Sequence, residues 1–486
     1  MNRRISSRFA AFVAASYTVA ATAAAAPASA PADAASRQLA HDIFKQLVEI
    51  NTTDSVGSTT LAARAMADRL LAAGFAPADV VVLGPNERKG NLVARYRGKV
   101  GGTKRPLLII AHLDVVEARR EDWTTDPFRF VEQDGYFYGR GTQDMKDNDA
   151  IVVADFIRLK TRGYVPNRDM ILALTADEEG GRSNGVDWLL KNHRELVDAE
   201  FVLNPDAGGV STDHGKPLAI EIEATEKLYA DFQLLATNPG GHSSLPKPDN
   251  AIYHVADALG KLERTPFAFE LNAVTREYLA HMQTVETAQN AADIRAVLAS
   301  TPDPEAIARL SADARYNSTL RTTCVATMLS GGHAPNALPQ RAEANVNCRI
   351  LPGHSQEEIR RELVRLFDDP ELGVRYRSDA GDLADVASDR KAMAPPPLRA
   401  DVMDAIRSAS ASRWPGTPII PEMETGASDS VYTMLAGIPS YGVSGVAIDR
   451  DDVRMHGKDE RVRVASFDAG LDFYRDFLIA LTSDKR

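Results

Sequence analysis

Short apolar runs alternate with amphipathic stretches along most of the chain, from about residue 36 onward. Runs such as Leu107–Ile110, Ile171–Leu174 and Phe201–Leu203 are bounded by polar turns, which is typical of strands buried on both faces of a sheet. The stretches between them, for example Ala150–Lys160, carry their apolar residues at helical spacing. This alternation predicts an α/β domain with a mixed, mostly parallel central sheet.

The pattern changes after about residue 216, where strand-like runs become longer and alternate between apolar and polar residues. A strand, a helix, a hairpin, a second helix and a last strand follow in the order β-α-β-β-α-β: 227–236, 250–262, 322–350, 356–367 and 373–377. This order predicts a ferredoxin-like α+β domain inserted into the first. The expected division is a signal peptide at 1–34, a catalytic domain in two parts at 35–216 and 383–486, and an inserted domain at 217–382. An extra helical segment at about 270–313 carries no functional interpretation.

The N-terminus has the composition of a secretory signal peptide. Met1–Arg8 is basic, Phe9–Ala26 is uncharged and rich in alanine, and Ala32–Ala34 offers a small-residue cleavage site. A membrane anchor fits less well because the run is short and mostly alanine. We therefore expect export across the inner membrane, into the periplasm.

Charge and cysteine content exclude several classes of protein. The net charge is −11, which argues against nucleic acid or an anionic membrane as a partner. Only two cysteines occur, Cys324 and Cys348, so neither a disulfide scaffold nor a cysteine-ligated zinc site is expected. The two lie opposite each other if the 322–350 hairpin pairs Ser330 near Ala342, and a disulfide and two separately buried thiols are then equally compatible with the sequence.

Side chains that can bind metals follow several of the expected strands. His112 and Asp114 end one strand, Asp177-Glu178-Glu179 follows another, and Asp206 follows a third. Asp144 lies in a glycine-bearing loop before a helix, and His456 lies near the C-terminus. Each alone is an ordinary polar turn residue. Together they meet at the carboxyl edge of the sheet, where ligands bind in α/β proteins. Two imidazoles and several carboxylates without cysteine suit zinc, or cobalt or manganese.

These residues form an ordered set of motifs that resembles a known family. The motifs are His-Leu-Asp-Val at 112–115, Gly-Arg-Gly-x-x-Asp-x-Lys at 139–146, Asp-Glu-Glu-Gly at 177–180 and Met-His-Gly at 455–457. They resemble those of the co-catalytic di-zinc exopeptidases and amidohydrolases that include carnosine dipeptidase, glutamate carboxypeptidase, aminoacylase and succinyl-diaminopimelate desuccinylase. The resemblance extends from about Ser36 to Thr482, and it implies a zinc-exopeptidase-like catalytic domain with an inserted lid domain that forms dimers.

The resemblance also implies a role for each motif residue. Five ligands would hold two zinc ions: His112 and Asp206 one, Glu179 and His456 the other, with Asp144 between them. Asp114 would orient the His112 ring, and Glu178 would be the general base. A cis peptide bond is expected between Asp144 and Met145.

Further residues of the resemblance concern the substrate. His242 would stabilise the oxyanion, commonly in the active site of the other subunit of a homodimer, although a plain surface histidine is the alternative. Asn336 and Arg349 would bind the substrate carboxylate, with a structural ion pair as the alternative for Arg349. Gly426 and Ser444 lie in glycine-rich loops expected to line the pocket.

Two features bear on specificity and function. Asp147 stands where the family usually has glycine and could serve as a helix N-cap. Asp206, as in the aminopeptidases and dipeptidases of the family, favours a peptide with a free N-terminus. The sequence therefore predicts a secreted two-zinc exopeptidase acting on dipeptides or short peptides. The alternatives are an N-acyl-amino-acid deacylase or carboxypeptidase, a catalytically silent binding protein and a two-metal phosphodiesterase.

Overall fold

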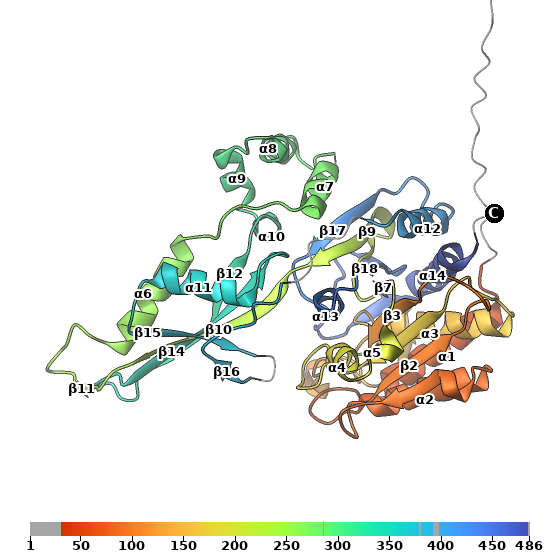
Figure 1. Ribbon diagram of the computed structural model, residues 1–486, viewed down its shortest axis with the longest axis horizontal. Helices are drawn as coiled ribbons and strands as arrows, with labels where there is room; N and C mark the ends of the chain where they lie inside the picture. The colour runs from red at the N-terminus through yellow and green to blue at the C-terminus, as the bar shows by residue number, and fades with distance from the viewer. Residues whose placement is uncertain (1–30, 285, 379–380, 392–397, 485–486) are drawn as a thin grey trace, which may run out of the picture.

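The chain folds into a large body built on one central sheet and a smaller body that projects from it. The structure, a computed structural model, describes residues 31–484 except 285, 379–380 and 392–397. Figure 1 shows the large body on the right and the smaller one on the left, joined where the chain crosses between β9 and β10. The expected fold class, an α/β domain with a mixed, mostly parallel central sheet, is confirmed.

The central sheet has ten strands in the order β1-β2-β6-β3-β7-β18-β9-β8-β19, with β17 paired to β9. Its middle strands β6, β3, β7 and β18 are parallel to one another, whereas β1 and β2, and β9 with β8 and β18, pair in the antiparallel direction. The strands are β1 (Val80–Leu83), β2 (Asn91–Tyr96), β3 (Leu107–His112), β6 (Met170–Thr175), β7 (Phe201–Asn204), β8 (Gly209–Asp213), β9 (Lys216–Glu226), β17 (Ile419–Glu424), β18 (Ser440–Gly442) and β19 (Ala447–Asp449).

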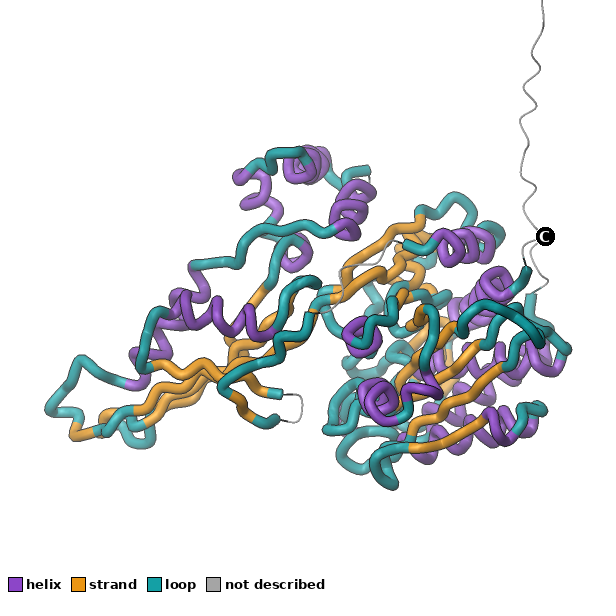
Figure 2. Tube along the Cα trace, viewed as in Figure 1, coloured by secondary structure: helices purple, strands orange, loops and turns teal. Residues whose placement is uncertain are grey.

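Helices cover both faces of this sheet (Figures 1 and 2). One face packs against α1 (Ala34–Glu49), α2 (Thr59–Ala72), α3 (Lys146–Thr161), α12 (Ala400–Ser410) and α14 (Val464–Thr482). The other packs against α4 (Gly185–Asn192), α5 (Arg194–Val197) and the region of α13 (Ser430–Leu435). A small sheet of β4 (Val131–Gln133), β5 (Tyr136–Tyr138) and β20 (Arg461–Arg463) lies beside α1 and α14 through the aromatic ring of Phe137.

The covering helices explain why the interior strands are apolar without interruption. In β3, Leu107 and Ile109 join the core beneath α1 and α3, while Leu108 and Ile110 join the core beneath α4. Successive side chains of a strand point to opposite faces. Because both faces are covered, every position of β3 is apolar until His112, which ends the strand.

The start of α1 fixes the first described residues. Asp33 caps the helix by accepting a hydrogen bond from Ser36 N, and Ala32 N donates to Asp472 Oδ1 at 2.8 Å. Most of the expected signal peptide, residues 1–30, lies outside the described residues. Among the described residues, none of the helices has the length and apolar character that a membrane crossing requires.

The smaller body, which we call the lid, consists of a five-stranded antiparallel sheet with α6 (Ala251–Arg264) and α11 (Gln356–Phe367) packed on one face. Its strand order is β12-β14-β10-β15-β16, in which the first four follow the ferredoxin-like arrangement. The strands are β10 (Leu228–Thr237), β12 (Thr323–Gly331), β14 (Arg341–Ile350), β15 (Leu372–Arg377) and β16 (Leu383–Ala384). A two-stranded ribbon of β11 (Gly241–His242) and β13 (Ala337–Leu338) lies at the end of the lid remote from the central sheet (Figure 1).

The change from one sheet to the other comes later than residue 217, where the sequence placed it. Residues 216–226 form β9, which pairs with β8, β17 and β18 in the central sheet. The sequence of β9 alternates apolar and acidic residues from Ile220 to Glu223, as a lid strand would, although β9 belongs to the central sheet. At the other boundary, β16 begins at Leu383 and Ala387 N donates to Glu357 Oε2 of α11 at 2.8 Å, so the lid continues past residue 382.

The extra helical segment lies against the central sheet as well as the lid. It forms α7 (Ala273–Met282), α8 (Ala288–Leu298), α9 (Pro304–Leu310) and α10 (Ala314–Thr319). Its apolar side chains, including Leu279 and Leu310, share a core with Ala219 of β9 and Ile420 of β17. The segment therefore braces the region where the chain crosses into the lid.

The two cysteines are joined by a disulfide in the lid. Cys324 of β12 faces Cys348 of β14 across an antiparallel pair, and the two sulfur atoms are bonded. The register is shifted by one residue between Ala326 and Met328, a β-bulge. Of the two possibilities that the sequence left open, the structure shows the bridged one, which ties the edge strand β12 to the interior of the lid sheet.

Candidate active site

The metal-binding side chains meet at the carboxyl edge of the central sheet. The parallel strands β3, β6 and β7 end at His112, Thr175 and Asn204. The residues that follow these strands therefore emerge on one side of the sheet. Asp144 and His456 reach the same place from the loops before α3 and β20.

Asp144 lies between the two histidines. Its Oδ1 is 3.1 Å from His112 Nε2, and its Oδ2 is 3.1 Å from His456 Nε2. Asp206 Oδ1 lies 3.5 Å from His112 Nε2, and Glu179 Oε2 lies 2.9 Å from His456 Nε2. The five residues thus form two donor sets that share the Asp144 carboxylate.

The chemistry of these donors fits divalent metal ions. Ligand atoms of His112, Asp144 and Glu179 all lie within 4.8 Å of one another. Glu179 Oε1 is buried and has no hydrogen-bond partner among the described residues. This oxygen atom is therefore available to bind a metal. Imidazole and carboxylate without thiolate suit zinc, cobalt or manganese.

The site is closed on one side and open on the other. The side chain of His112 is 1% exposed, whereas that of His456 is 57% exposed. His112 and Asp206 therefore form the inner half of the site, and His456 faces the solvent from which a substrate would enter.

Asp114 lies against the His112 ring with both its backbone carbonyl and its carboxylate, whose Oδ1 is 3.8 Å from Nδ1. The His112 ring is oriented by the backbone carbonyl of Asp114, which lies 3.0 Å from Nδ1. A carbonyl only accepts, so Nδ1 carries the proton and Nε2 keeps its lone pair for a metal. The Asp114 carboxylate also accepts from the backbone N–H groups of Glu178 and Glu179, at 3.2 and 2.9 Å. It thereby holds the turn that carries Glu178 and Glu179.

Burial and mutual repulsion raise the pKa of several carboxyl groups in this cluster. Burial raises the pKa of Asp114 to about 7. Burial also raises the pKa of Glu178 well above its usual value, and the neighbouring carboxylates Asp206, Asp429 and Glu179 raise it further. Hydrogen bonds to Asp144 and Glu179 raise the pKa of His456 to about 10. Burial is the main cause for Asp114 and Glu178, while the carboxylates around Glu178 and His456 add a negative potential that divalent cations would relieve.

Glu460 organises the loop that carries Asp144. Its Oε1 accepts from Gln143 N and Asp144 N at 2.7 and 3.2 Å, and its Oε2 accepts from Gly141 N and Arg140 Nη1 at 3.0 and 2.6 Å. The Asp144–Met145 peptide bond is cis, as expected. Glu460 is fully buried and follows His456 by four residues, so it joins the segments that supply two of the ligands.

Asp147 is not the helix N-cap that the sequence suggested. The helix α3 begins at Lys146 with Met145 at the N-cap position. Asp149 N already donates to the Met145 carbonyl at 3.0 Å, so the helical hydrogen bonds begin before Asp147 and leave it no capping position. Asp147 lies inside the first turn, where it is fully buried and its Oδ1 accepts from Asn148 N.

The structure does not bring His242 and Asn336 to the metal ligands of their own chain. Both lie on the ribbon at the remote end of the lid, where Ser243 N donates to the Asn336 carbonyl at 3.1 Å. Figure 1 shows this ribbon at the opposite end of the lid from the central sheet. The His242 ring is exposed and hydrogen-bonded to Ser244 Oγ at 2.7 Å.

Arg349 lies at the end of the lid nearest the central sheet. It is on β14, opposite Tyr229, and its guanidinium lies 4.8 Å from the centre of the Tyr229 ring. Gly426 follows β17, and its N–H donates to Glu424 Oε1 at 2.9 Å. Ser444 is buried, donates to Asn148 Oδ1 and accepts from Val446 N. Its hydroxyl therefore holds the loop against α3 and is already engaged within the protein.

Three residues that support the site gave no clear signal in the sequence. Glu460 and Lys89 lie in polar loops that look solvent-exposed. Asp429 belongs to a glycine-rich loop, yet it is buried and accepts from Asn184 Nδ2 and Thr175 Oγ1 at 2.6 and 3.1 Å. Only the folded chain shows that these side chains turn inward.

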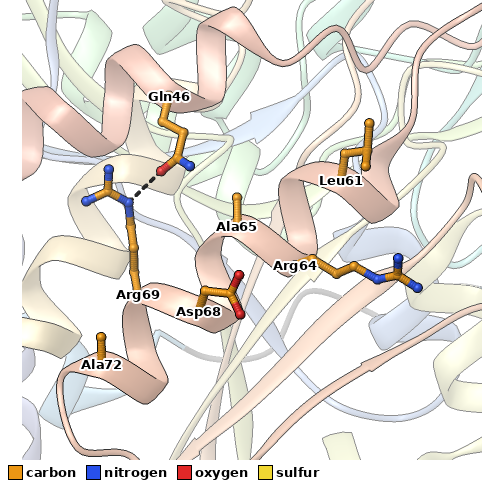
Figure 3. A pocket seen from close by; sticks show the side chains of 7 residues that line it. All are labelled: Gln46, Leu61, Arg64, Ala65, Asp68, Arg69 and Ala72. Atoms are coloured by element: carbon orange, nitrogen blue, oxygen red, sulfur yellow. Dashed lines mark hydrogen bonds between the residues drawn. The ribbon is translucent and has the colours of Figure 1, made fainter.

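A shallow depression elsewhere on the surface does not belong to this site. It lies between α1 and α2, and Figure 3 shows its lining, in which Arg69 Nε donates to Gln46 Oε1 at 2.6 Å. Its other lining residues are Leu61, Arg64, Ala65, Asp68 and Ala72. None of these lining residues belongs to the motifs that carry the metal ligands.

Removing either histidine should remove part of the metal. We expect His112→Ala and His456→Ala each to lower the amount of bound divalent metal by about one ion per chain, because each imidazole serves a different donor set. Equilibrium dialysis followed by atomic absorption measures the stoichiometry. His354→Ala is the control, since His354 pairs with Glu270 in the lid. Unchanged stoichiometry in both site variants would contradict the assignment.

Comparison with known sequences identifies the family. Residues 108–480 match the profile of peptidase family M20/M25/M40. Probable carboxypeptidase S-like 2 of Dictyostelium discoideum is 27% identical over 410 residues, which cover 79% of this chain and 73% of that protein. The human N-fatty-acyl-amino acid synthase/hydrolase PM20D1 is 27% identical over 396 residues, which cover 78% and 75%.

Solved structures agree on the fold. An M20 family metallo-carboxypeptidase from Sulfolobus solfataricus superimposes with a TM-score of 0.65 at 16% identity, covering 91% of this chain and 99% of that one. The dipeptidase Dug1p from Saccharomyces cerevisiae gives a TM-score of 0.63 at 16% identity, covering 93% and 97%. The family profile spans most of the chain and includes the motif residues from His112 to His456. The chain therefore belongs to peptidase family M20/M25/M40.

Proposed function

We propose that this protein is an exported metal-dependent exopeptidase that hydrolyses the amide bond of dipeptides or short peptides. The observation that carries the proposal is the Asp144 carboxylate held between two imidazoles, with Glu179 and Asp206 beside them. The complete donor set and the presence of Glu178 argue against a silent binding protein. Membership of a peptidase family argues against a phosphodiesterase.

Glu178 is the group that moves the proton. It follows Asp177 in the turn after β6, and its carboxyl group interacts electrostatically with His112 and Asp206. Two divalent metals bound at the site would supply Lewis acidity that acidifies a water and polarises the amide carbonyl. Glu178 then accepts a proton from the attacking water and returns it to the leaving nitrogen. The N–H groups of Glu178 and Glu179, held by Asp114, keep the base in place during both steps.

Arg349 supplies a cation for the carboxylate of the substrate. It stands on the open face of the lid sheet and makes no ion pair with a described carboxylate within 4.0 Å. The guanidinium fork pairs bidentately with a carboxylate. The position of Arg349 at the end of the lid nearest the central sheet therefore supports a substrate with a free C-terminal carboxylate.

N-acyl amino acids are the second candidate substrates. The similarity to carboxypeptidase S-like 2 and to PM20D1 covers more than three quarters of this chain, and the name of the second describes hydrolysis of N-fatty-acyl amino acids. Both substrate classes end in an amino-acid carboxylate. They differ in whether the other end carries a free amine, which Asp206 favours through the resemblance to dipeptidases.

We also propose export and a homodimer formed through the lid. Ala32 and Asp33 contact the folded protein, which supports a cut upstream of residue 32 and not after Ala34, where the sequence placed it; N-terminal sequencing of the exported protein tests this. The edge strand β12 exposes Val325, Met328 and Leu329, and pairing of two such edges would bury them. His242 would then be free to reach the site of the partner.

The dimer proposal has a direct test. We expect Val325→Asp combined with Leu329→Asp to convert a dimer into a monomer, because two charges on the edge oppose its pairing. Light scattering after size-exclusion chromatography gives the mass. Val165→Asp changes an exposed valine of the central body and should leave the dimer intact. A wild-type protein that is monomeric at micromolar concentration would refute the proposal.

Replacement of the base should abolish turnover and spare metal binding. We expect Glu178→Gln to lower kcat by about 10²- to 10⁴-fold, the usual contribution of a general base, at unchanged zinc content. Steady-state hydrolysis and metal analysis of the same sample measure both quantities. Glu195→Gln, an exposed site on α5, is the matched control. A Glu178→Gln enzyme with wild-type kcat would overturn the assignment of the base.

A substrate panel separates the two candidate classes. We expect free dipeptides and N-acyl amino acids to be hydrolysed faster than the same compounds with an amidated C-terminus, since the Arg349 guanidinium would pair with the carboxylate and not with the amide. Arg349→Met should raise KM by about tenfold and remove this preference, whereas Arg349→Lys should keep part of it. Cleavage only of substrates without a free N-terminal amine would favour N-acyl amino acids as the substrate class. Equal rates for acids and amides would contradict the role of Arg349.

A further inference from the structure

The first acid of the Asp-Glu-Glu motif does not join the metal ligands. Asp177 closely follows the buried end of β6, and its side chain is fully buried. Its Oδ1 forms an ion pair with Lys89 Nζ, and its Oδ2 accepts from Ser183 N at 3.1 Å. Both carboxylate oxygens are thus used away from the metal edge.

Lys89 reaches Asp177 from a loop far away in the sequence. It lies between β1 and β2, is 8% exposed, and also donates to Asp54 Oδ1 at 2.6 Å. Burial lowers the pKa of Lys89, but the hydrogen bonds to Asp177 and Asp54 outweigh this effect and raise it above its usual value. The ammonium group therefore stays charged in the folded enzyme near neutral pH.

The loop that carries Lys89 is itself held rigidly. Gly90 N donates to Thr60 Oγ1 at 2.7 Å, and Asn86 Oδ1 accepts from the backbone N–H groups of Arg88 and Lys89 at 3.0 and 3.1 Å. The Arg88 guanidinium donates to the carbonyls of Gly57 and Asp54. Lys89 is therefore a fixed anchor and not a mobile surface lysine.

The turn at Asp177 has a conformation that needs such an anchor. Asp177 has a φ of 60°, in the left-handed region that residues with a Cβ seldom adopt. A Cβ on Gly181 would lie 2.3 Å from Asp177 Oδ2, so the turn closes tightly around this carboxylate. Beyond it, the backbone N–H groups of Glu178 and Glu179 bind Asp114. The turn is thus held by Lys89 on one side and by Asp114 on the other.

We propose that Lys89 is a positioning residue for the reaction: by pairing with Asp177, it fixes the turn that aims Glu178 at the water and Glu179 at the metal. The expected effect of Lys89 on turnover rests on the proposed function. Its expected effect on metal binding rests only on the set of metal-binding side chains. Without the ammonium group, the buried carboxylate one residue before the base loses the cation that compensates it.

Four variants and a control test this role. Lys89→Met should lower kcat by at least about tenfold with KM changed by less than about threefold, because a misplaced base affects turnover more than binding. Its zinc affinity should fall about tenfold, as for other residues that support a metal ligand. Lys89→Arg should retain part of the wild-type kcat and part of the wild-type zinc affinity. Asp177→Asn should also lower kcat more than it changes KM, but by less than Lys89→Met does. The amide oxygen of the new side chain would still accept from Ser183 N.

The double variant separates positioning from general destabilisation. Lys89→Met combined with Asp177→Asn removes the uncompensated charge, so its kcat and zinc affinity should be nearer to wild type than those of Lys89→Met alone. Arg168→Met is the matched control. It breaks a buried ion pair with Glu200, at 2.8 Å, two residues before β6 and at the opposite edge of the sheet. We expect it to lower the melting temperature and leave kcat unchanged.

The readouts distinguish failure of this inference from failure of the proposed function. Lys89→Met and Asp177→Asn proteins with wild-type kcat and wild-type zinc affinity would overturn the role of Lys89. A loss of activity in Arg168→Met equal to that in Lys89→Met would do the same. A wild-type protein inactive on every substrate would refute the proposed function, and calorimetric titration of the metal-free variants with zinc would still decide whether Lys89 positions Glu179.

Discussion

The structure depends on compensating the negative charge gathered at one edge of the central sheet. Asp114, Asp144, Glu178, Glu179 and Asp206 come within a few residues of strand ends or of α3, where Asp114 is buried and the other four are partly buried. Buried carboxylates are tolerated only when cations or several donors compensate them. The protein uses both means: Lys89 and Arg140 pair with Asp177 and Glu460, backbone N–H groups bind Asp114, and the central donor set remains for divalent metals.

Compensation also explains how the site is built from distant segments. Glu460 binds the loop before α3, and Asp114 binds the turn after β6. Each of these carboxylates satisfies backbone donors of a segment that itself carries a metal ligand or the base. The expected ligands are therefore held by acids that accept hydrogen bonds from the backbone of their loops, at 3.2 Å from Asp144 N to Glu460 and from Glu178 N to Asp114.

The lid is joined to the sheet by the crossing at Glu226 and Lys227 and is braced by a separate helical segment. Lys227 is buried at this crossing, and its ammonium group donates to the Arg321 carbonyl at 2.7 Å. The helices α7 to α10 share a core with β9 and β17. Arg349 lies at this braced end and His242 at the remote end, so the two lid residues stand in different positions: one beside its own central sheet, the other far from it, where only a second subunit would bring a site within reach.

The fold class and the positions of the chemistry follow from the residue pattern alone. Apolar runs covered on both faces predict an interior parallel sheet, and polar residues at the ends of those runs meet at one edge because parallel strands point the same way. Domain boundaries were predicted less well, since β9 alternates apolar and acidic residues as a lid strand does and yet lies in the central sheet. The assignment of individual atoms needed the folded chain. Whether Asp114 uses its carbonyl or its carboxylate, whether Asp177 faces a metal or Lys89, and whether Cys324 meets Cys348 all depend on side-chain directions and on contacts between segments distant in the sequence, which local sequence patterns do not encode.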